Sequence, residues 1–277
     1  MVGGTSQDLA LRGGRVHLRE WGEGEPVLLL HGVLTHSFIF EPIVPMLAAR
    51  YRVLVPDLLG CGASEKVEAE LSISAHAART LALMDALKLE KVHLVGHDVG
   101  GGIAQLMALN AEARFSSLSL INPVGYDYWP VPAIETLRLP IIRQLVMASF
   151  DLGTLKALIR HGLAHPERLD AALFARFAEP FSTQAGRQSF LAFLRALSAS
   201  ELMKRASELT TLTLPTLVLH GAKDHYLSTE ITRRLAEDIP EARLEQLEDV
   251  GHFAMLDAPE AVAEALLTLL DQASTAP

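Results

Sequence analysis

The sequence lacks the features that mark disulfide-bonded, membrane-spanning and metal-binding proteins. Its 277 residues include one cysteine, Cys61, so no internal disulfide can form, and a lone thiol gives no support for a metal site. No uninterrupted apolar run approaches the roughly 20 residues that a membrane helix needs. The first residues also lack a basic stretch followed by an apolar one, which a secretory leader would show. We therefore expect a metal-free and cofactor-free cytoplasmic protein.

The sequence also has little positive charge. The formal net charge is −9, and no long basic run interrupts the chain. Nucleic acid and anionic membrane are attracted by clustered lysine and arginine, so neither is expected as a partner. The hydrophobic fraction of 49% and the charged fraction of 21% are those of an ordinary globular protein. A small molecule is the expected partner, and the sequence does not indicate an oligomeric state.

Short apolar runs alternate with helical patterns over both ends of the chain. We predict buried strands at 27–30, 51–55, 92–95, 118–121 and 216–219, and helices at 75–89, 99–111 and 229–238. Continuous apolar strands of this kind suit a parallel sheet that is covered on both faces. The alternation therefore predicts an α/β fold with a doubly wound, mostly parallel sheet. An antiparallel hairpin, with strands near 9–11 and 16–20, is expected to precede it.

The alternation stops between about residues 122 and 214, where no convincing strand appears. Several amphipathic helical stretches in this region predict a helical insertion at 123–213, with the core formed by residues 1–122 and 214–277. Six phenylalanines are spread through the insertion. We expect most of them to form its own core and a few to line an apolar pocket. They are Phe150, Phe174, Phe177, Phe181, Phe190 and Phe193.

The most informative segment is 96–102, which reads Gly-His-Asp-Val-Gly-Gly-Gly between an apolar run and a helical pattern. This is the strand, tight turn and helix of a nucleophile elbow, in which the central position usually holds serine. Here Asp98 occupies it. A carboxylate at this position can attack carbon directly and become an alkyl ester, whereas serine would be acylated. His97 beside it is expected to pack against the site without reacting.

A second glycine turn follows the strand at 27–30. Residues 31–34 read His-Gly-Val-Leu, and a glycine directly after a strand lets the next N–H point into a site. The N–H groups of Val33 and Val99 are therefore candidates for an oxyanion hole. A further loop, 57–64, is rich in glycine, but no Lys-Ser or Lys-Thr pair follows it. We interpret that loop as structural, held by hydrogen bonds of Asp57 and Ser64.

Two more polar residues follow in the order that such a site requires. Asp224 lies just past the strand at 216–219, and the carboxyl ends of strands are where open α/β sheets place their sites. His252 lies in the loop Asp-Val-Gly-His-Phe at 249–253, which is expected to precede a short helical C-terminus. Nucleophile, acid and histidine in this chain order are expected of the α/β-hydrolase arrangement.

Nearly all of residues 15–272 therefore resembles the α/β-hydrolase superfamily, in which the helical insertion corresponds to a cap domain. An aspartate in Gly-His-Asp-Val-Gly-Gly resembles the epoxide hydrolase and haloalkane dehalogenase branch. The resemblance implies that Asp98 is the nucleophile, His252 the base and Asp224 its orienting acid. Some members carry the acid after the preceding strand instead. That place reads Ile-Asn-Pro-Val at 121–124, without a carboxylate, which favours Asp224.

The sequence leaves the leaving group open. Haloalkane dehalogenases usually have tryptophan after the nucleophile and often asparagine after His-Gly, where this chain has Val99 and Val33. Epoxide hydrolases use tyrosines of the cap as acids, for which Tyr126 and Tyr128 are candidates, and Trp129 offers an N–H. The alternative for these three residues is a hinge packed with aromatic side chains. His36 and Phe38 are candidates for pocket lining. We therefore predict that the protein opens epoxides or displaces halide from a hydrophobic small molecule, with epoxides slightly favoured.

Two alternatives stay open. The enzyme could act on esters or lactones, or run a cofactor-free acid–base reaction in which Asp98 is the base. A ligand-binding protein without catalysis is less favoured, because binding alone does not need an Asp–His–Asp set. A panel of epoxides, haloalkanes and esters separates these classes.

Overall fold

The computed structural model describes residues 4–67, 70–127 and 152–275. Eight strands form one sheet in the order β1-β2-β4-β3-β5-β6-β7-β8. β1 pairs antiparallel with β2, and β2 with β4, while all other neighbours are parallel. The strands are β1 Thr5–Leu11, β2 Gly14–Trp21, β3 Pro26–Leu30, β4 Arg52–Pro56, β5 Val92–Asp98, β6 Phe115–Pro123, β7 Thr216–Gly221 and β8 Ala242–Leu247.

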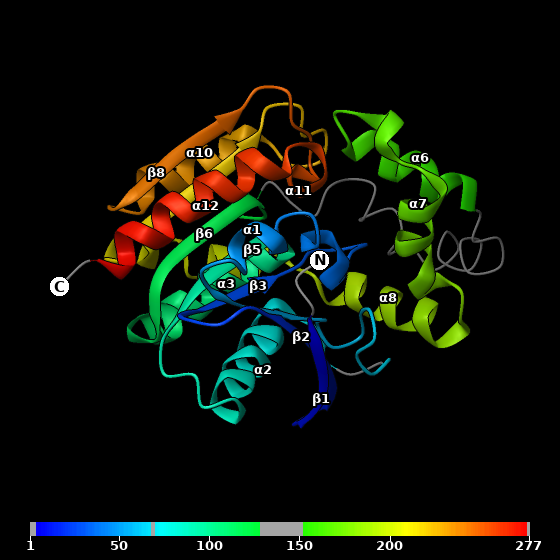
Figure 1. The fold of residues 1–277 in the computed structure, drawn as a ribbon, viewed down its shortest axis with the longest axis horizontal. Helices are drawn as coiled ribbons and strands as arrows, with labels where there is room; N and C mark the ends of the chain where they lie inside the picture. Colours follow the sequence, from blue (N-terminus) through cyan, green and yellow to red (C-terminus); the bar gives the residue numbers. More distant parts are fainter. Residues whose placement is uncertain (1–3, 68–69, 128–151, 276–277) are drawn as a thin grey trace.

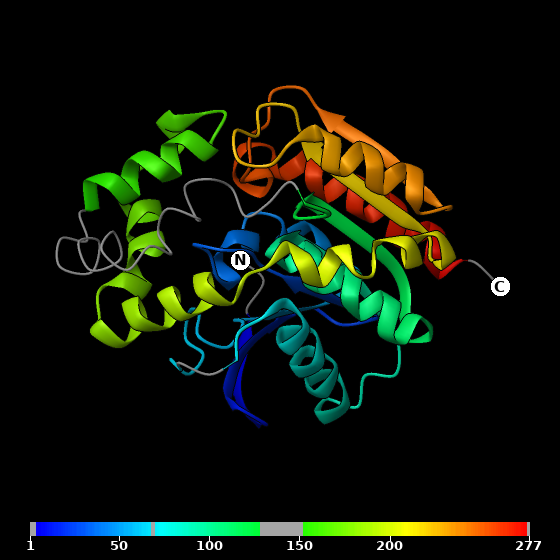
Figure 2. The same cartoon turned by 180° about the vertical axis from the view of Figure 1, so that it is seen from behind.

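Helices cover both faces of this sheet (Figures 1 and 2). One face is covered by α2 (Ile73–Ala86), α3 (Val99–Ala111) and α10 (Thr229–Asp238), whose apolar residues share one buried cluster. The other face is covered by α1 (Val44–Leu47), α11 (Ala254–Asp257) and α12 (Pro259–Ser274), with a second cluster. The mostly parallel, doubly wound α/β fold expected from the sequence is confirmed.

The central strands are buried along their whole length, which explains their apolar composition. Every residue of β5 and β7 is buried, as is all of β6 except one residue near its start. The pairing register brings Leu30 of β3 beside Gly96 of β5, and Asp98 beside Pro123 of β6. The carboxyl ends of these parallel strands therefore meet at one edge, and the loops that leave them are neighbours.

Several predicted elements agree with the structure, and two differ. The antiparallel hairpin is present, and α3 and α10 span the predicted residues. Strand β8 was not predicted, because this edge strand is half exposed and carries arginine, glutamate and glutamine among its apolar residues. The final helix, α12, is a 16-residue helix rather than a short one, since Pro259 begins it and its apolar side faces the sheet.

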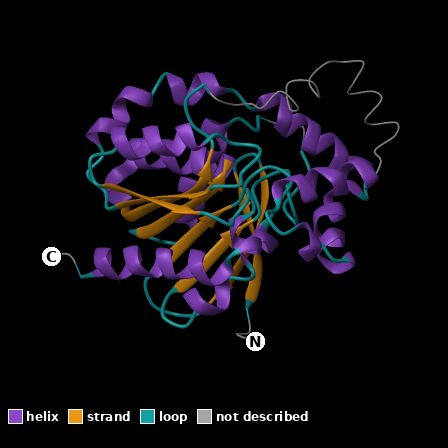
Figure 3. Ribbon diagram, turned by 90° about the horizontal axis from the view of Figure 1, so that it is seen from above, coloured by secondary structure: helices purple, strands orange, loops and turns teal. Residues whose placement is uncertain are grey.

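A helical region lies between β6 and β7; its first helices gather at one end of the sheet, and its last part returns along α3 (Figures 1, 2 and 3). Its described helices are α6 Leu152–Gly162, α7 Ala171–Ala178, α8 Gln184–Ala196 and α9 Ala199–Met203, with short 3-10 turns at Pro166–Arg168, Glu179–Phe181 and Ala206–Thr211. Phe177, Phe181 and Phe193 are buried, whereas Phe150 lies outside the described residues. We call this region the insertion.

The described part of the chain contains neither a membrane-spanning helix nor a metal-binding cluster. None of its helices is long and apolar enough to cross a membrane. No group of three or more His, Cys, Asp and Glu side chains is placed there to hold a metal ion.

Candidate active site

Asp98 occupies a strained turn between β5 and α3. Its φ of 54° and ψ of −121° lie in a region that side-chain-bearing residues rarely adopt. The glycines on either side make the turn possible. A Cβ on Gly96 would lie 2.3 Å from the carbonyl oxygen of Gly100, and a Cβ on Gly100 would lie 2.1 Å from that of Leu30. The Gly-x-Asp-x-Gly spacing is therefore required by backbone packing, and the turn lifts the carboxyl group above the strand ends.

Two backbone N–H groups hold the Asp98 carboxyl group. Val33 N donates to its Oδ2 at 2.7 Å, and Val99 N also donates to the carboxyl group. The close approach of the two turns depends on Gly32, because a Cβ there would lie 2.3 Å from Asp98 Oδ2. Val33, one of the two donors predicted as an oxyanion hole, thus donates to Asp98 Oδ2, and the N–H of Val99 acts on the same carboxyl group.

The Asp98 side chain is almost completely shielded from solvent. The residue is 7% exposed, and this burial raises the pKa of its carboxyl group. The positive charge available on His252 and the N–H groups of Val33 and Val99 act in the opposite direction. A buried carboxylate with few hydrogen-bonding partners is a stronger nucleophile than a hydrated one, since less solvation has to be lost on attack.

His252 and Asp224 form a buried pair beside Asp98. His252 Nδ1 lies 2.9 Å from Asp224 Oδ2, and the two side chains are 6% and 0% exposed. The other oxygen of Asp224 accepts hydrogen bonds from the N–H groups of Tyr226 at 2.7 Å and Leu227 at 3.0 Å. Asp224 is therefore fixed by its own loop, and it fixes the ring of His252 with Nδ1 toward the acid.

Asn122 is a further site residue that the sequence reasoning missed. Its Nδ2 donates to Asp224 Oδ2 at 2.7 Å, so the same oxygen serves His252 and Asn122. Asn122 stands at the end of β6 with a φ of 41°. The position is where some family members carry the acid. An amide in Asn-Pro directly after a buried strand was the available signal.

The charges of the pair shift both pKa values. Burial of Asp224 would raise its pKa, but His252, Leu227 and Asn122 outweigh burial and hold the pKa well below the usual range. Burial would lower the pKa of His252, but the charge and hydrogen bond of Asp224, together with the charge of Asp98, raise it. The arrangement therefore stabilises a protonated imidazole between two carboxylates.

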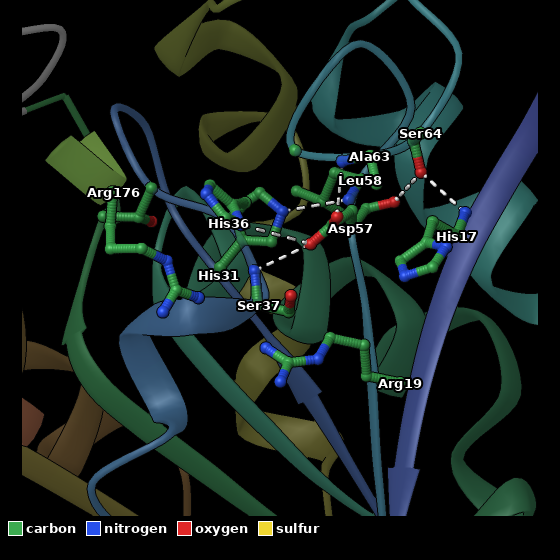
Figure 4. Close-up of polar contacts among 12 residues, drawn as sticks. His17, Arg19, His31, His36, Ser37, Asp57, Leu58, Ala63, Ser64 and Arg176 are labelled. Carbon is green, nitrogen blue, oxygen red and sulfur yellow. Dashed lines mark hydrogen bonds and ion pairs between the residues drawn. The ribbon is translucent and has the colours of Figure 1, made fainter. Parts of the chain in front are cut away.

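Asp57 supports the turn that carries Val33 (Figure 4). Its carboxylate accepts from Ser37 N at 2.8 Å and Ala63 N at 2.7 Å, and its carbonyl accepts from Ser64 Oγ at 2.6 Å. The ring of His31 bridges the same loops, since its Nε2 accepts from Leu58 N and its Nδ1 contacts the Gly32 carbonyl. The predicted structural loop at 57–64 is confirmed.

Comparison with known proteins shows the family to which this fold belongs. A family model described as the alpha/beta hydrolase fold matches residues 25–259. The chain belongs to the α/β-hydrolase fold family. It is a hydrolase.

Haloalkane dehalogenase 2 of Mycobacterium tuberculosis is 29% identical over 92% of this chain and 91% of its own. The cis-3-alkyl-4-alkyloxetan-2-one decarboxylase of Shewanella oneidensis is 25% identical over 92% and 84%. Among solved structures, haloalkane dehalogenase DbeA from Bradyrhizobium elkani has a TM-score of 0.89 at 22% identity over 99% of this chain and 100% of its own.

His97 lies against the catalytic histidine candidate of this hydrolase. Its Nε2 is 2.9 Å from the carbonyl oxygen of His252, and the ring centroids are 5.0 Å apart. Complete burial lowers the pKa of His97 to about 3, so the ring is neutral and donates through Nε2. The ring packs against His252 and Phe253 and holds the main chain of His252.

His36 and Phe38 lie where the loop after β3 meets the insertion. The rings are 4.6 Å apart, and Phe38 packs edge-on against Phe177 of α7 at 4.9 Å. Phe177 contacts Phe253, which in turn contacts His252. His36 is buried, with Nδ1 3.7 Å from an oxygen of Asp57, toward which it points in Figure 4. Both rings thus belong to an aromatic series between the insertion and His252, and their contact with substrate stays a prediction.

The three aromatic residues predicted at the start of the insertion have different outcomes. Tyr126 is 2% exposed, and its hydroxyl donates to Asp238 Oδ2 of α10 at 2.8 Å. The guanidinium of Arg234 covers its ring at 4.0 Å. The hydroxyl of Tyr126 is therefore bound to α10 and is not free to protonate a substrate, contrary to the prediction. Tyr128 and Trp129 lie outside the described residues.

Proposed function

We propose that this hydrolase attacks an electrophilic sp3 carbon with the Asp98 carboxylate and forms an alkyl ester, which a water activated by His252 then cleaves. The observation that carries the proposal is the 2.7 Å hydrogen bond from Val33 N to Asp98 Oδ2 beside the His252–Asp224 pair. A carboxylate held in this way has one oxygen in the oxyanion hole and the other free for attack.

In the first step, the free oxygen of Asp98 displaces the leaving group in line. A C–O bond forms to the substrate carbon, and its bond to halide or to the epoxide oxygen breaks, so that halide departs with the electron pair or the epoxide oxygen takes a proton from an acid or from water. The N–H groups of Val33 and Val99 fix the carboxylate orientation, so little freedom is lost at the moment of attack. The aromatic series around Phe253 supports an apolar substrate.

In the second step, neutral His252 removes a proton from water through Nε2. The hydroxide attacks the carbonyl carbon of the Asp98 ester, and the two N–H donors stabilise the oxyanion. The alcohol oxygen then leaves with the proton that His252 took from water, and the carboxylic acid formed releases its own proton to solvent, which restores the Asp98 carboxylate. Alkylation removes the Asp98 charge that helps to raise the pKa of His252. Ester formation thereby favours the neutral imidazole that this step requires.

The leaving group depends on donors that face the departing atom. Each tyrosine that the structure describes gives its hydroxyl to a protein acceptor: Tyr51 to Asp271, Tyr126 to Asp238 and Tyr226 to the Leu158 carbonyl. Trp21, the described tryptophan, lies on β2 beneath Arg19. We retain epoxide opening as the first candidate and halide displacement as the second, since Val33 and Val99 carry no halide-binding side chain.

A lactone is a further candidate substrate, for a specific reason. Attack of Asp98 on the alkyl carbon of a strained lactone releases a carboxylate, which needs neither a halide-binding N–H nor a general acid because its pKa lies far below neutrality. The similarity to an oxetan-2-one decarboxylase points to the same substrate class. The non-catalytic alternative predicts binding without turnover of any substrate in the panel below.

Intact-mass analysis of the His252→Gln variant tests the proposal. We expect a stable adduct on Asp98 after addition of a reactive epoxide, haloalkane or β-lactone, because attack proceeds and hydrolysis does not. Asp98→Asn is the matched control and should give no adduct. In the wild type, a single turnover in heavy-oxygen water should place the label in the Asp98 carboxylate. Turnover of an ester by the wild type without any adduct in the variant would overturn the covalent route.

A further inference from the structure

The end of helix α6 contacts the His252 loop through main-chain atoms. The Gly162 carbonyl oxygen accepts a hydrogen bond from His252 N at 2.8 Å, and Phe253 N approaches it at 3.4 Å. On its other side, the His252 carbonyl accepts from His97. The peptide groups of His252 are therefore held between the insertion and the turn that carries Asp98.

Two glycines allow this close approach. A Cβ on Gly251 would lie 2.6 Å from the Gly162 carbonyl oxygen and 2.7 Å from Ala164 N. A Cβ on Gly162 would lie 2.7 Å from the ring of Phe253 and 2.8 Å from that of Tyr226. Because both sides of the junction lack a side chain, the backbones of the insertion and the His252 loop meet directly.

Asp257 joins the same two segments. Its Oδ2 accepts from Gly251 N at 2.9 Å and from Ala164 N at 2.9 Å, and its Oδ1 approaches His165 N at 3.3 Å. The residue is 4% exposed. One buried carboxylate thus binds backbone donors from the loop before His252 and from the segment after α6. Arg168 also donates to the main-chain carbonyls of Leu256 and Asp257.

We propose that Asp257 is a positioning residue that sets the place of His252 by tying its loop to the insertion. Asp257 acts through the main chain, since its bonds reach Gly251 and Ala164 rather than the imidazole. The ring of His252 is oriented by Asp224, and its backbone is located by Asp257, Gly162 and His97. Movement of α6 relative to the core therefore displaces the base while Asp98 keeps its own support from Val33.

Because different residues hold His252 and Asp98, the two chemical steps can be tested separately. The inference rests on the proposed covalent function. His252 acts in ester hydrolysis, whereas alkylation depends on Asp98 and its N–H donors. In Asp257→Asn, the NH2 of the new amide faces a backbone N–H that had donated a hydrogen bond to the carboxylate, so that hydrogen bond is lost. We expect the rate constant of ester hydrolysis to fall by about 10- to 100-fold, as for a catalytic group misplaced by roughly 1 Å. Alkylation should change far less, so alkyl-enzyme accumulates.

Rapid-quench mass spectrometry measures the two rate constants separately, with a β-lactone, epoxide or haloalkane that labels the His252→Gln enzyme. Asp271→Asn is the matched control. The Asp271 carboxylate also accepts hydrogen bonds, but from the side chains of Arg50 and Tyr51 on the core, neither of which belongs to the His252 loop. Gly162→Ala perturbs the junction from the insertion side and decides the question if Asp257→Asn does not fold. Equal slowing of both steps, or unchanged hydrolysis in a folded variant, overturns the inference.

Amide hydrogen exchange separates this inference from the proposed function. If Asp257 holds the junction, exchange at His252 and Ala164 accelerates by about 10-fold or more in Asp257→Asn and is unchanged in Asp271→Asn. This readout needs no substrate. A His252→Gln enzyme that never forms an adduct would refute the covalent route and leave the exchange result to judge Asp257. Unchanged exchange at both amides would refute the positioning role.

Discussion

Replacement of Gly32 by alanine tests the oxyanion turn without altering any group that reacts. The new Cβ would lie 2.3 Å from Asp98 Oδ2 and 2.4 Å from Asp98 Cβ, both distances well below the 3.0 Å that real Cβ contacts respect. The turn and the carboxylate must therefore separate by about 0.7 Å. The hydrogen bond from Val33 N, now 2.7 Å long, would lengthen to roughly 3.4 Å, beyond the normal range.

Loss of one oxyanion donor typically removes roughly 3 to 4 kcal/mol of transition-state stabilisation, which corresponds to a loss of about 100- to 1000-fold in kcat. The assay is the steady-state rate on whichever substrate class labels the His252→Gln enzyme. The free energy of unfolding, measured in parallel, shows whether the variant stays folded at the assay temperature. We expect the rate to fall by far more than the folded fraction.

Gly125→Ala is the control substitution. Its Cβ would meet the γ2 methyl of Ile231 at 2.9 Å and other atoms at 3.7 Å or more, so a single side-chain contact has to adjust and no reacting residue is touched. This variant should keep the wild-type rate. If folded Gly32→Ala also keeps a rate close to that of the wild type, then Val33 does not hold the reacting carboxylate and the reasoning fails.

Two further predictions concern charges around the site. Asp224→Asn removes the main interaction that raises the pKa of His252, so the acidic limb of the pH–rate profile moves to lower pH than in the wild type. The maximal rate also falls, by about 10⁴ if the loss of the orienting carboxylate matters as it does in serine proteases; an unmoved limb would contradict the assignment. Glu41→Gln weakens the contacts of Glu41 with Arg19 and Arg176, which join the core to α7. Because these side chains are about one-third exposed, thermal or chemical unfolding should show a loss below about 1 kcal/mol that shrinks in high salt.

Local sequence signals were sufficient for the sheet and for the turn at Asp98. Continuous apolar runs identified five of the parallel strands, and the glycines at 96 and 100 marked a turn that only a residue without a side chain permits. Such features depend on neighbours in the chain, so they can be recognised before the fold is known. The edge strand β8 was not predicted, because one side of it faces solvent and its polar residues interrupt the apolar run by which the other strands were recognised.

Contacts between distant segments were decided by tertiary structure alone. Tyr126 was a reasonable acid by position, yet the fold places Asp238 within 2.8 Å of its hydroxyl, 112 residues away in sequence. Asp257 carries no motif of its own, and Asn122 has only the Asn-Pro pair after a strand; their importance comes from donors and acceptors that folding brings close. The sequence by itself determined the identity of the carboxylate at the turn and the order of its partners. Tertiary structure decided which polar atoms remain free to contact a substrate. Buried polar groups are usually hydrogen-bonded, and their partners come from segments that are distant in sequence and close only in the folded protein.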